Sequence, residues 1–276
     1  MNLFVTGATG FIGSHFVNEA QRAGHGVVAL RRPGSHPRFP LNEEPTWLEG
    51  TLEGDYESAL RQCDALVHLA SHTPNPPYDT LQNCLYWNVQ ASIRLADQAR
   101  RSGIRQYLIA GSCFEYGSSA ERFERIPPYA PLNPTLSYPT SKAAASVAFY
   151  GFAAEHGLSM KILRIFQVFG EGEDEKRFWP SLRRAAESGA DFPMTLGEQR
   201  RDFIEVGTLA QALVRELDFT DVQAGVPDVR NVGSGSEQSL LEFSREWWKR
   251  WGATGQLLPG AVPYRKNEIM RLIPEV

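Results

Sequence analysis

The stretch Leu3-Phe4-Val5-Thr6-Gly7-Ala8-Thr9-Gly10-Phe11-Ile12-Gly13 joins a short apolar run to three glycines in a GxxGxxG spacing. The run predicts a buried strand, and residues 12–23 predict the helix that follows it. In such a turn, one glycine permits the tight bend, another lets the backbone approach a pyrophosphate, and the third allows close helix–strand packing. The stretch therefore predicts the first unit of a dinucleotide-binding fold, with an ordinary strand-to-helix turn as the alternative. The residues expected at the cofactor are Gly7, Thr9, Gly10, Phe11, Ile12 and Gly13.

Four further apolar runs along the chain predict buried strands. They lie at residues 27–30, 65–69, 107–110 and 161–166, with helical segments between them at 57–63, 82–101 and 138–155. Strands that alternate with helices in this way are typical of an α/β, doubly wound, Rossmann-like parallel sheet covered on both faces. Ligands of such sheets bind beyond the carboxyl ends of the strands, so the residues after each run are the candidates for chemistry.

The composition changes after about residue 170. The stretch 171–180, EGEDEKRFWP, is charged, and helical stretches follow at 180–188 and 207–217. We expect residues 1–170 to form the dinucleotide-binding domain. We expect residues 171–276 to form a smaller, mixed α/β C-terminal lobe that binds substrate, with some sheet elements shared between the two.

Composition and charge disfavour several classes of protein. The 276 residues carry 28 basic and 32 acidic side chains, a formal net charge of −4, and without a basic excess nucleic-acid binding is disfavoured. The three cysteines, Cys63, Cys84 and Cys113, form no CxxC pair, so neither a disulfide framework nor a metal site is indicated. No stretch has the apolar length of a membrane span, and the first residues lack the positive region of a signal peptide. We expect a cytoplasmic protein that does not bind membranes.

Two arginines, Arg31 and Arg32, follow the second predicted strand, close to where an NAD-binding fold places an acid for the adenosine ribose. Guanidinium groups accommodate a 2′-phosphate through paired hydrogen bonds, whereas a carboxylate repels it. The pair therefore favours NADP(H) as the cofactor, with NAD(H) as the alternative. A solvated arginine pair in a surface loop would explain the same residues.

Tyr138 and Lys142 lie four residues apart in SYPTSK, at the start of a predicted helix, so their side chains share one face. A phenol with a pKa of about 10 is a poor acid–base catalyst at neutral pH, and a nearby ammonium group lowers that pKa. Ser112 follows the fourth apolar run, which places a hydroxyl at the carboxyl end of a strand. The three residues predict a general acid/base site. An exposed aromatic–cation pair is the alternative for Tyr138 and Lys142 taken alone.

At these residues the chain resembles the extended short-chain dehydrogenase/reductase family, in its NAD-dependent epimerase/dehydratase group that modifies nucleotide sugars. The matching motifs are TGATGFIGSH at 6–15, DALVHLA at 64–70, GSCFEYG at 111–117, SYPTSK at 137–142, LRIFQVFG at 163–170, RRDFIEV at 200–206 and NVGSG at 231–235. The resemblance covers nearly the whole chain. It implies an NAD(P)-dependent enzyme that acts on a nucleotide-diphosphate sugar.

The resemblance also implies a role for each matching residue. Tyr138 is the general acid/base, Lys142 holds the nicotinamide ribose and tunes Tyr138, and Ser112 orients the carbonyl or hydroxyl group of the sugar. A guanidinium clamp on the phosphates of the sugar nucleotide is implied for Arg201. Further cofactor contacts are implied for Leu69, Ala70, Asn88 and Phe166.

Several positions depart from the family pattern. In the 4,6-dehydratases two acids directly follow the catalytic hydroxyl, whereas here these positions hold Cys113 and Phe114, and Glu115 comes one place later. A dehydratase is therefore disfavoured. Leu52 lies where many members carry an Asp that meets the adenine of the cofactor, and Gln167 replaces an Asn that is common near the substrate diphosphate.

Two histidines near the predicted site have different expectations. His68 lies inside an apolar strand and is expected to be a hydrogen-bonded core residue. His72, two residues past Ala70, is expected to face the substrate, as is Cys113.

The main hypothesis from the sequence is an NADP(H)-dependent reductase of a nucleotide-linked 4-keto-6-deoxy sugar, because two arginines favour NADPH and the dehydratase acids are missing. One alternative is a nucleotide-sugar 4-epimerase that keeps NAD tightly bound. An alternative of another class is a non-catalytic NAD(P)-binding sensor or scaffold. Small apolar residues in the helices at 82–101 and 138–155 resemble the paired-helix interface of the family, and they predict a homodimer.

Overall fold

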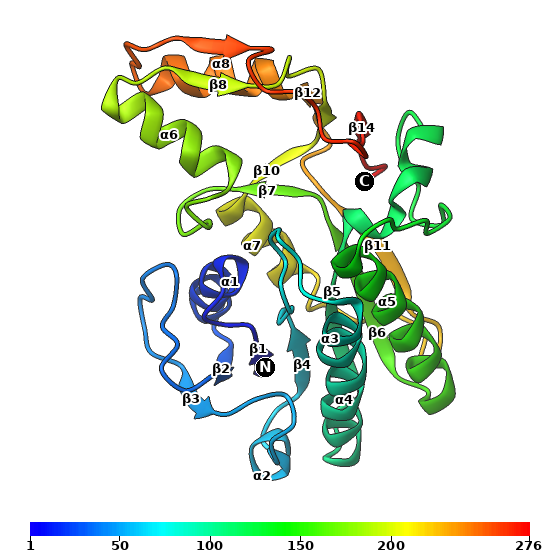
Figure 1. Cartoon of the computed structure of the whole chain (residues 1–276). Coiled ribbons are helices and arrows are strands. Elements are labelled where there is room, and N and C mark those ends of the chain that lie inside the picture. Colours follow the sequence, from blue (N-terminus) through cyan, green and yellow to red (C-terminus); the bar gives the residue numbers. More distant parts are fainter.

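The computed structural model describes all 276 residues, and its centre is a seven-stranded parallel sheet (Figure 1). The strands are β1 Asn2–Thr6, β2 Gly26–Arg31, β3 Thr46–Glu49, β4 Ala65–His68, β5 Gln106–Ser112, β6 Ser159–Ile165 and β11 Asp228–Val232. Their order across the sheet is β3-β2-β1-β4-β5-β6-β11. The predicted doubly wound, Rossmann-like sheet is confirmed, and all five predicted strands are present.

The sequence does not predict the two edge strands, β3 and β11. β3 reads TWLE and pairs only with β2, and β11 reads DVRNV and pairs only with β6. Neither strand contains the continuous apolar run of a strand buried between two neighbours, because each has one open edge. Apolar patterning therefore identifies the interior of this sheet and not its borders.

Side chains of the inner strands alternate between two hydrophobic cores, because successive residues of a strand point to opposite faces. In β1, Leu3 and Val5 belong to one core and Phe4 to the other. Helices α1 and α7 cover the first core, and α4 and α5 cover the second. Their bounds are α1 Phe11–Arg22, α4 Ser92–Arg101, α5 Ser137–His156 and α7 Val206–Arg215, and a short α2 spans Glu57–Leu60.

The crossover between β4 and β5 is not the single helix that the sequence predicts over 82–101. It begins as α3 Leu81–Leu85, continues as the π-helix η1 Tyr86–Ala91, and ends as α4. A π-helix holds one more residue between bonded groups than an α-helix does, and such segments are frequent at functional sites. Here it lies over the carboxyl end of β4 and supplies Asn88 to the cavity described below.

The smaller lobe lies above the sheet in Figure 1 and is built from short strands and two helices. The strands are β7 Gln167–Phe169, β8 Phe192–Met194, β9 Arg200–Arg201, β10 Phe203–Glu205, β12 Gln238–Ser239, β13 Leu257–Pro259 and β14 Arg271–Leu272, and the helices are α6 Phe178–Ser188 and α8 Leu240–Arg250. An aromatic cluster joins the two helices: Trp179 of α6 packs edge-on against Trp247 of α8 with ring centroids 5.6 Å apart. Two short 3-10 helices, η2 Cys113–Tyr116 and η3 Ser118–Arg122, follow β5.

The division of the chain at residue 170 stays a prediction. β11 and α7 come after this residue, yet β11 completes the large sheet and α7 packs against α1.

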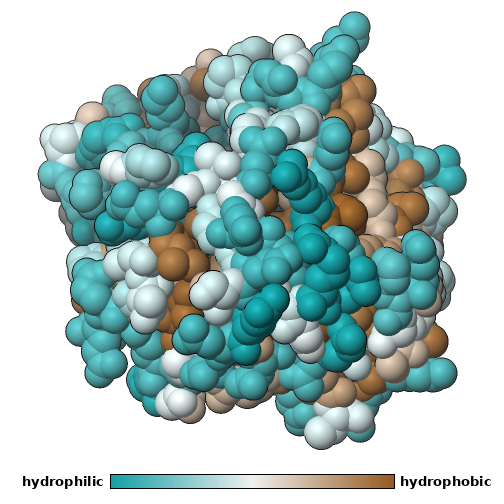
Figure 2. Space-filling view, turned by 90° about the horizontal axis from the view of Figure 1, so that it is seen from below, coloured by the Kyte–Doolittle hydropathy of each residue, from teal (hydrophilic) through white to brown (hydrophobic).

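The surface carries apolar side chains on the outer side of the α3–α5 helices. Leu81 of α3, Tyr86 of η1, and Val147 and Tyr150 of α5 are all exposed. Figure 2 shows apolar surface on the side of the molecule where α4 and α5 lie. None of the helices has both the length and the apolar composition that crossing a membrane requires.

Candidate active site

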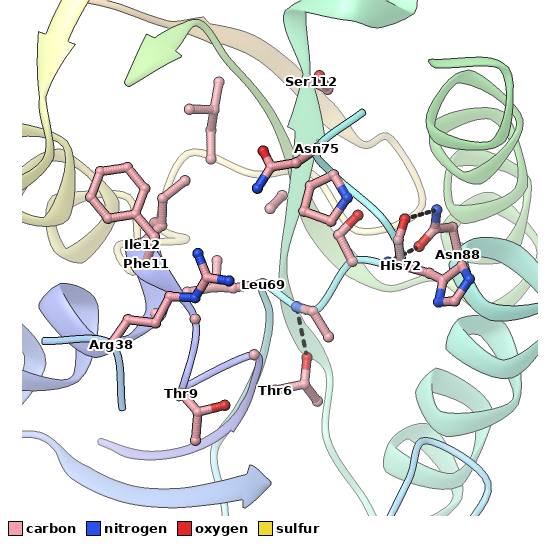
Figure 3. A pocket seen from close by; sticks show the side chains of 18 of the residues that line it. Thr6, Thr9, Phe11, Ile12, Arg38, Leu69, His72, Asn75, Asn88 and Ser112 are labelled. Carbon is pink, nitrogen blue, oxygen red and sulfur yellow. Dashed lines mark hydrogen bonds between the residues drawn. The ribbon is translucent and has the colours of Figure 1, made fainter. Parts of the chain in front are cut away.

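A cavity of about 780 Å³ opens at the carboxyl ends of the sheet strands, a volume within the range of small-molecule sites. Its walls come from the turns after β1, β2 and β4, from the end of β5, from the start of α5 and from the segment after β7 (Figure 3). Every predicted site residue but Arg201 lines it. These residues are Gly7, Thr9, Gly10, Phe11, Ile12, Gly13, Arg31, Arg32, Leu52, Leu69, Ala70, His72, Asn88, Ser112, Cys113, Tyr138, Lys142, Phe166 and Gln167.

The glycine-rich turn after β1 fits a dinucleotide. Gly7 has φ +75°, and a Cβ added to it would lie 2.6 Å from the backbone nitrogen of Ala70. A Cβ on Gly13 would overlap the carbonyl oxygen of Gly7. α1 begins after Gly10 with no side-chain cap and no acid in its first turn, so its amide donors are open to an anion such as a pyrophosphate.

The arginine pair after β2 is divided between two environments. Arg31 donates from Nη2 to Glu49 Oε1 at 2.9 Å, and its guanidinium lies 5.0 Å from the centroid of the Trp47 ring. Arg32 lines the cavity without an ion pair. Arg38 also lines this end of the cavity. Because Arg31 pairs with Glu49 and Arg38 pairs with Asp174, Arg32 is the arginine of this group that no carboxylate neutralises.

Tyr138 lies in the first turn of α5 with 7 % of its surface exposed. Burial raises the pKa of its phenol to about 12, and the side chains of Ser71 and Ser112 act in the opposite direction. The lowering of this pKa by Lys142 stays a prediction; the Lys142 ammonium group donates to the carbonyl oxygen of Ala110 at 2.7 Å. The phenol of Tyr138 is therefore protonated at neutral pH and is able to donate a hydrogen bond.

Ser112 ends β5 beside Tyr138 and begins the 3-10 helix η2. Its Oγ accepts the backbone N–H of Phe114 at 3.3 Å. In return Glu115 Oε1 accepts the backbone N–H of Ser112 at 2.7 Å, which completes a capping box. This reciprocal pair holds the serine at the cavity wall.

The predicted substrate residue His72 is held from two sides. Asn88 of the π-helix accepts the backbone N–H of His72 through Oδ1 at 2.7 Å (Figure 3). It also donates from Nδ2 to Ser141 Oγ at 2.8 Å. The ring of His72 pairs through Nε2 with Asp79 Oδ2 at 2.7 Å. Asn88 thus supports the cavity wall by linking the loop after β4 to α5, the helix of Tyr138.

His68 behaves as the expected core histidine. Its Nδ1 lies 2.8 Å from Thr6 Oγ1 and its Nε2 lies 3.0 Å from Ser92 Oγ. Burial, together with the charge of Lys142, lowers the pKa of His68 to about 3. The imidazole is neutral and bonded on both sides, as the sequence predicts.

Arg201 is the predicted site residue that the structure does not bring into the cavity. Its Nη2 donates to Glu268 Oε1 at 3.1 Å and to the carbonyl oxygen of Ile269 at 2.6 Å. The C-terminal segment before β14 therefore covers this guanidinium. Its charge still reaches Cys113, although burial dominates there and raises the pKa of the thiol to about 12.

Sequence reasoning missed a charged group that enters the cavity after β7. Glu173, Asp174 and Arg177 all line it, and Asp174 pairs with Arg38 across the cavity at 3.5 Å. Arg177 donates from Nε to Glu173 Oε1 at 3.3 Å, while Glu173 Oε2 is buried without a partner. Burial raises the pKa of Glu173 to about 7. A signal was present, because these charged residues follow the motif LRIFQVFG at 163–170, in which Phe166 and Gln167 were predicted to line the site.

Comparisons with known proteins show to which family the chain belongs. The model of the NAD dependent epimerase/dehydratase family matches residues 3–233. The chain is 27% identical to UDP-glucose 4-epimerase of Corynebacterium glutamicum, over 96% of this chain and 84% of that protein. It is 26% identical to CDP-abequose synthase of Salmonella muenchen, over 97% of this chain and 87% of that protein.

Among solved structures, MoeE5 in complex with UDP-glucuronic acid and NAD is similar to the whole chain. Its TM-score is 0.83, with 28% sequence identity over 100% of this chain and 90% of that chain. The family model alone spans most of the sequence, including the glycine-rich turn and the Ser112, Tyr138 and Lys142 positions. The chain is thus a member of the NAD dependent epimerase/dehydratase family of enzymes.

Proposed function

We propose that the protein is a nucleotide-sugar 4-epimerase that acts through a bound dinucleotide. The observation that carries the proposal is the convergence of Ser112, Tyr138 and Lys142 on one cavity wall beside the glycine-rich turn. Cys113, which follows the serine, holds a protonated thiol and not an acid of the kind that eliminates water. The chemistry available is therefore proton and hydride transfer without elimination.

Each residue has a proposed task. A nicotinamide cofactor supplies reversible hydride transfer when it is bound at this site. Tyr138 exchanges the proton of the sugar hydroxyl, Ser112 orients that oxygen by hydrogen bonding, and Lys142 binds the ribose next to the nicotinamide. Since epimerisation returns both hydride and proton to the sugar, it needs no net supply of cofactor.

The residues of the glycine-rich turn, with Leu52, Leu69, Ala70, Asn88 and Phe166, are proposed to line the cofactor. Except for Asn88 of the π-helix, they lie beyond β1, β3, β4 and β6, the position at which a Rossmann-like sheet binds a dinucleotide. His72, Cys113 and Gln167 are proposed to face the sugar nucleotide. All three line the same cavity as Ser112 and Tyr138, and Cys113 follows Ser112 directly in the chain.

The comparisons support an epimerase over the reductase that was the main hypothesis from the sequence. UDP-glucose 4-epimerases from several bacteria recur among the relatives, at 26–28% identity. At this identity the nucleotide and the sugar do not transfer to the chain. UDP-hexoses are the first substrates to test, because the names of these relatives refer to them.

A second function has one specific observation in its favour. Arg32, the residue after β2, lines the cavity without an ion pair, where the 2′-phosphate of NADP(H) would lie. An NADPH-dependent reductase of a 4-keto sugar nucleotide would use that charge. The identity of the cofactor separates the two functions.

The deciding experiment uses the purified, full-length protein. The cofactor is released by denaturation and identified by mass spectrometry, and the native protein is incubated with UDP-glucose, UDP-N-acetylglucosamine and UDP-glucuronic acid. We expect bound NAD and the 4-epimer of one sugar without change in absorbance at the nicotinamide band. If the protein instead consumes added NADPH in a 1:1 ratio with a 4-keto sugar nucleotide, the reductase function is correct and the epimerase function is wrong. Tyr138→Phe is the matched inactive control.

We also propose a homodimer formed through the α3–α5 face. This face carries four exposed side chains, those of Leu81, Tyr86, Val147 and Tyr150. Grouped exposed apolar side chains mark protein–protein contact sites, and a second copy of the chain would bury them.

A further inference from the structure

Glu115 is a fully buried carboxylate that lies behind the cavity wall and has no task in the reaction described above. Its side chain is 0 % exposed and does not line the cavity, so it cannot meet a substrate. Arg164 of β6, also buried, donates from Nε to Glu115 Oε2 at 2.8 Å. A buried ion pair adds little stability compared with apolar packing, so its place in the fold points to another purpose.

Three elements of the site meet at this carboxylate. Oε1 accepts the backbone N–H of Ser112 at the end of β5, at 2.7 Å. Oε2 accepts the hydroxyl of Ser146 from α5 at 2.8 Å, as well as Arg164 from β6. Ser146 follows Lys142 by four residues and therefore lies on the same face of α5. One side chain thus ties the strand of the serine to the helix of the lysine.

The side chains of Glu115 and Arg164 pack closely against the backbone of Gly111. A Cβ on Gly111 would lie 2.9 Å from Glu115 Oε1 and 3.1 Å from Arg164 Cγ. Arg164 is fixed on its other side, where Nη1 donates to the Tyr116 hydroxyl at 3.1 Å. The position of the Glu115 carboxylate is therefore determined from several directions.

We propose that Glu115 is a positioning residue that sets the hydroxyl of Ser112 relative to Tyr138 and Lys142. This inference rests on the proposed function, because it refers to the reaction that those three residues perform. The negative charge of Glu115 has a second effect on the same group. It raises the pKa of Lys142, against the larger lowering by burial.

The test separates position from charge. Glu115→Asp keeps the charge for Arg164 but is one methylene too short to reach both Arg164 and the Ser112 amide. We expect kcat to fall by about tenfold or more with KM for the sugar nucleotide little changed, because a displacement of about 1 Å at a reacting group can cost about a hundredfold. Equal kcat in the variant and the wild type, with both folded by circular dichroism, would overturn the inference.

Ser146→Ala keeps the test decisive if the aspartate variant does not fold. It removes only the tie from α5 and leaves the ion pair with Arg164 intact, so a smaller loss of kcat is expected. Ser119→Ala is the matched control, because Ser119 is equally buried in the same region and bonds to the Tyr116 carbonyl oxygen, not to Glu115. Equal kcat for the two alanine variants would contradict the proposal.

A measurement without substrate distinguishes this inference from the proposed function. In a TROSY spectrum, the Ser112 amide proton should lie downfield because it is bonded to a carboxylate, and it should move upfield in Glu115→Asp. An unchanged Ser112 resonance would overturn the inference, whatever the activity. If the wild type turns over no nucleotide sugar, the proposed function is wrong. The Ser112 amide resonance still tests the role of Glu115 in that case.

Discussion

The side-chain nitrogen of Lys142 lies 2.7 Å from the carbonyl oxygen of Ala110, and no carboxylate pairs with it. Only 5 % of the residue is exposed, and burial lowers the pKa of the ammonium group. A charge that is buried without an ionic partner destabilises a fold. The location of Lys142 is thus explained by function and not by stability.

We predict that Lys142→Met unfolds at the same or a higher temperature than the wild type but loses activity by about a hundredfold or more, since the site loses the cation that is proposed to bind the ribose. Thermal unfolding and turnover of the same samples check both halves. Lys161→Met is the matched control. Lys161 is equally buried but pairs with Glu216 at 2.7 Å outside the cavity, so its loss should lower the melting temperature and spare the activity. If Lys142→Met lowers the melting temperature as Lys161→Met does, the predicted stability of the Lys142 variant is wrong.

Stability should fall in mild acid because of His68. Burial lowers its pKa from 6.5 to about 3, so between these values the unfolded chain binds a proton that the folded chain does not. Its contribution is complete above pH 6.5 and is lost as the pH falls towards 3, by about 1.4 kcal/mol per pH unit. Urea unfolding at pH 7, 6 and 5 measures this slope. His68→Gln should flatten the slope, whereas the exposed His36→Gln should not; equal slopes in all three proteins would refute the assignment.

Arg177 should contribute to substrate affinity. Its Nε is bonded to Glu173, but its terminal nitrogens have no protein partner on the cavity wall. We expect Arg177→Leu to raise KM for the sugar nucleotide by about tenfold, the effect of one charge-assisted hydrogen bond, and to lower the melting temperature, because the buried Glu173 loses its ion-pair partner. Steady-state kinetics and calorimetry provide the measurement. Arg230→Leu, which removes exposed ion pairs with Glu216 and Asp228, serves as the control and should leave KM unchanged.

The α3–α5 face should hold two copies of the chain together. Light scattering at micromolar concentration is expected to give about twice the 30.8 kDa mass of one chain. Val147→Glu places a charge on this face, where Val147 is 65 % exposed, and should shift the mass towards the monomer. Leu196→Glu changes a residue with 50 % exposure in the smaller lobe and should leave the mass unaltered. A monomeric wild type would remove the proposed interface.

The interior of the fold was accessible from the sequence because β1, β4, β5 and β6 are buried on both faces and so form continuous apolar runs. The edge strand β11 reads DVRNV and carries no such signal. Most strands of the smaller lobe are two or three residues long, too short to show a period. Hydrophobic patterning thus predicts the inner strands of the large sheet, but it does not predict the edge strands or the short strands of the smaller lobe.

The candidate site divides in the same way. Residues that follow a strand, such as Ala70 and Ser112, could be predicted, since the ends of parallel strands meet at one edge of the sheet. The partners of Arg201 and Glu115 could not. Glu268 lies 67 residues from Arg201, and Arg164 lies 49 residues from Glu115, so neither pair belongs to one motif.

α7 and β11 lie late in the sequence, so they are synthesised after the strands that they cover or pair with. Leu163 and Ile165 of β6 share a core with Leu209 of α7 and Val232 of β11. On the ribosome, the first 170 residues emerge with that side of the sheet covered by α1 but not by α7, and translation at about 5–20 residues per second leaves it so for several seconds. The nascent protein therefore passes through a stage in which a half-covered sheet is open to chaperones or to a neighbouring nascent chain.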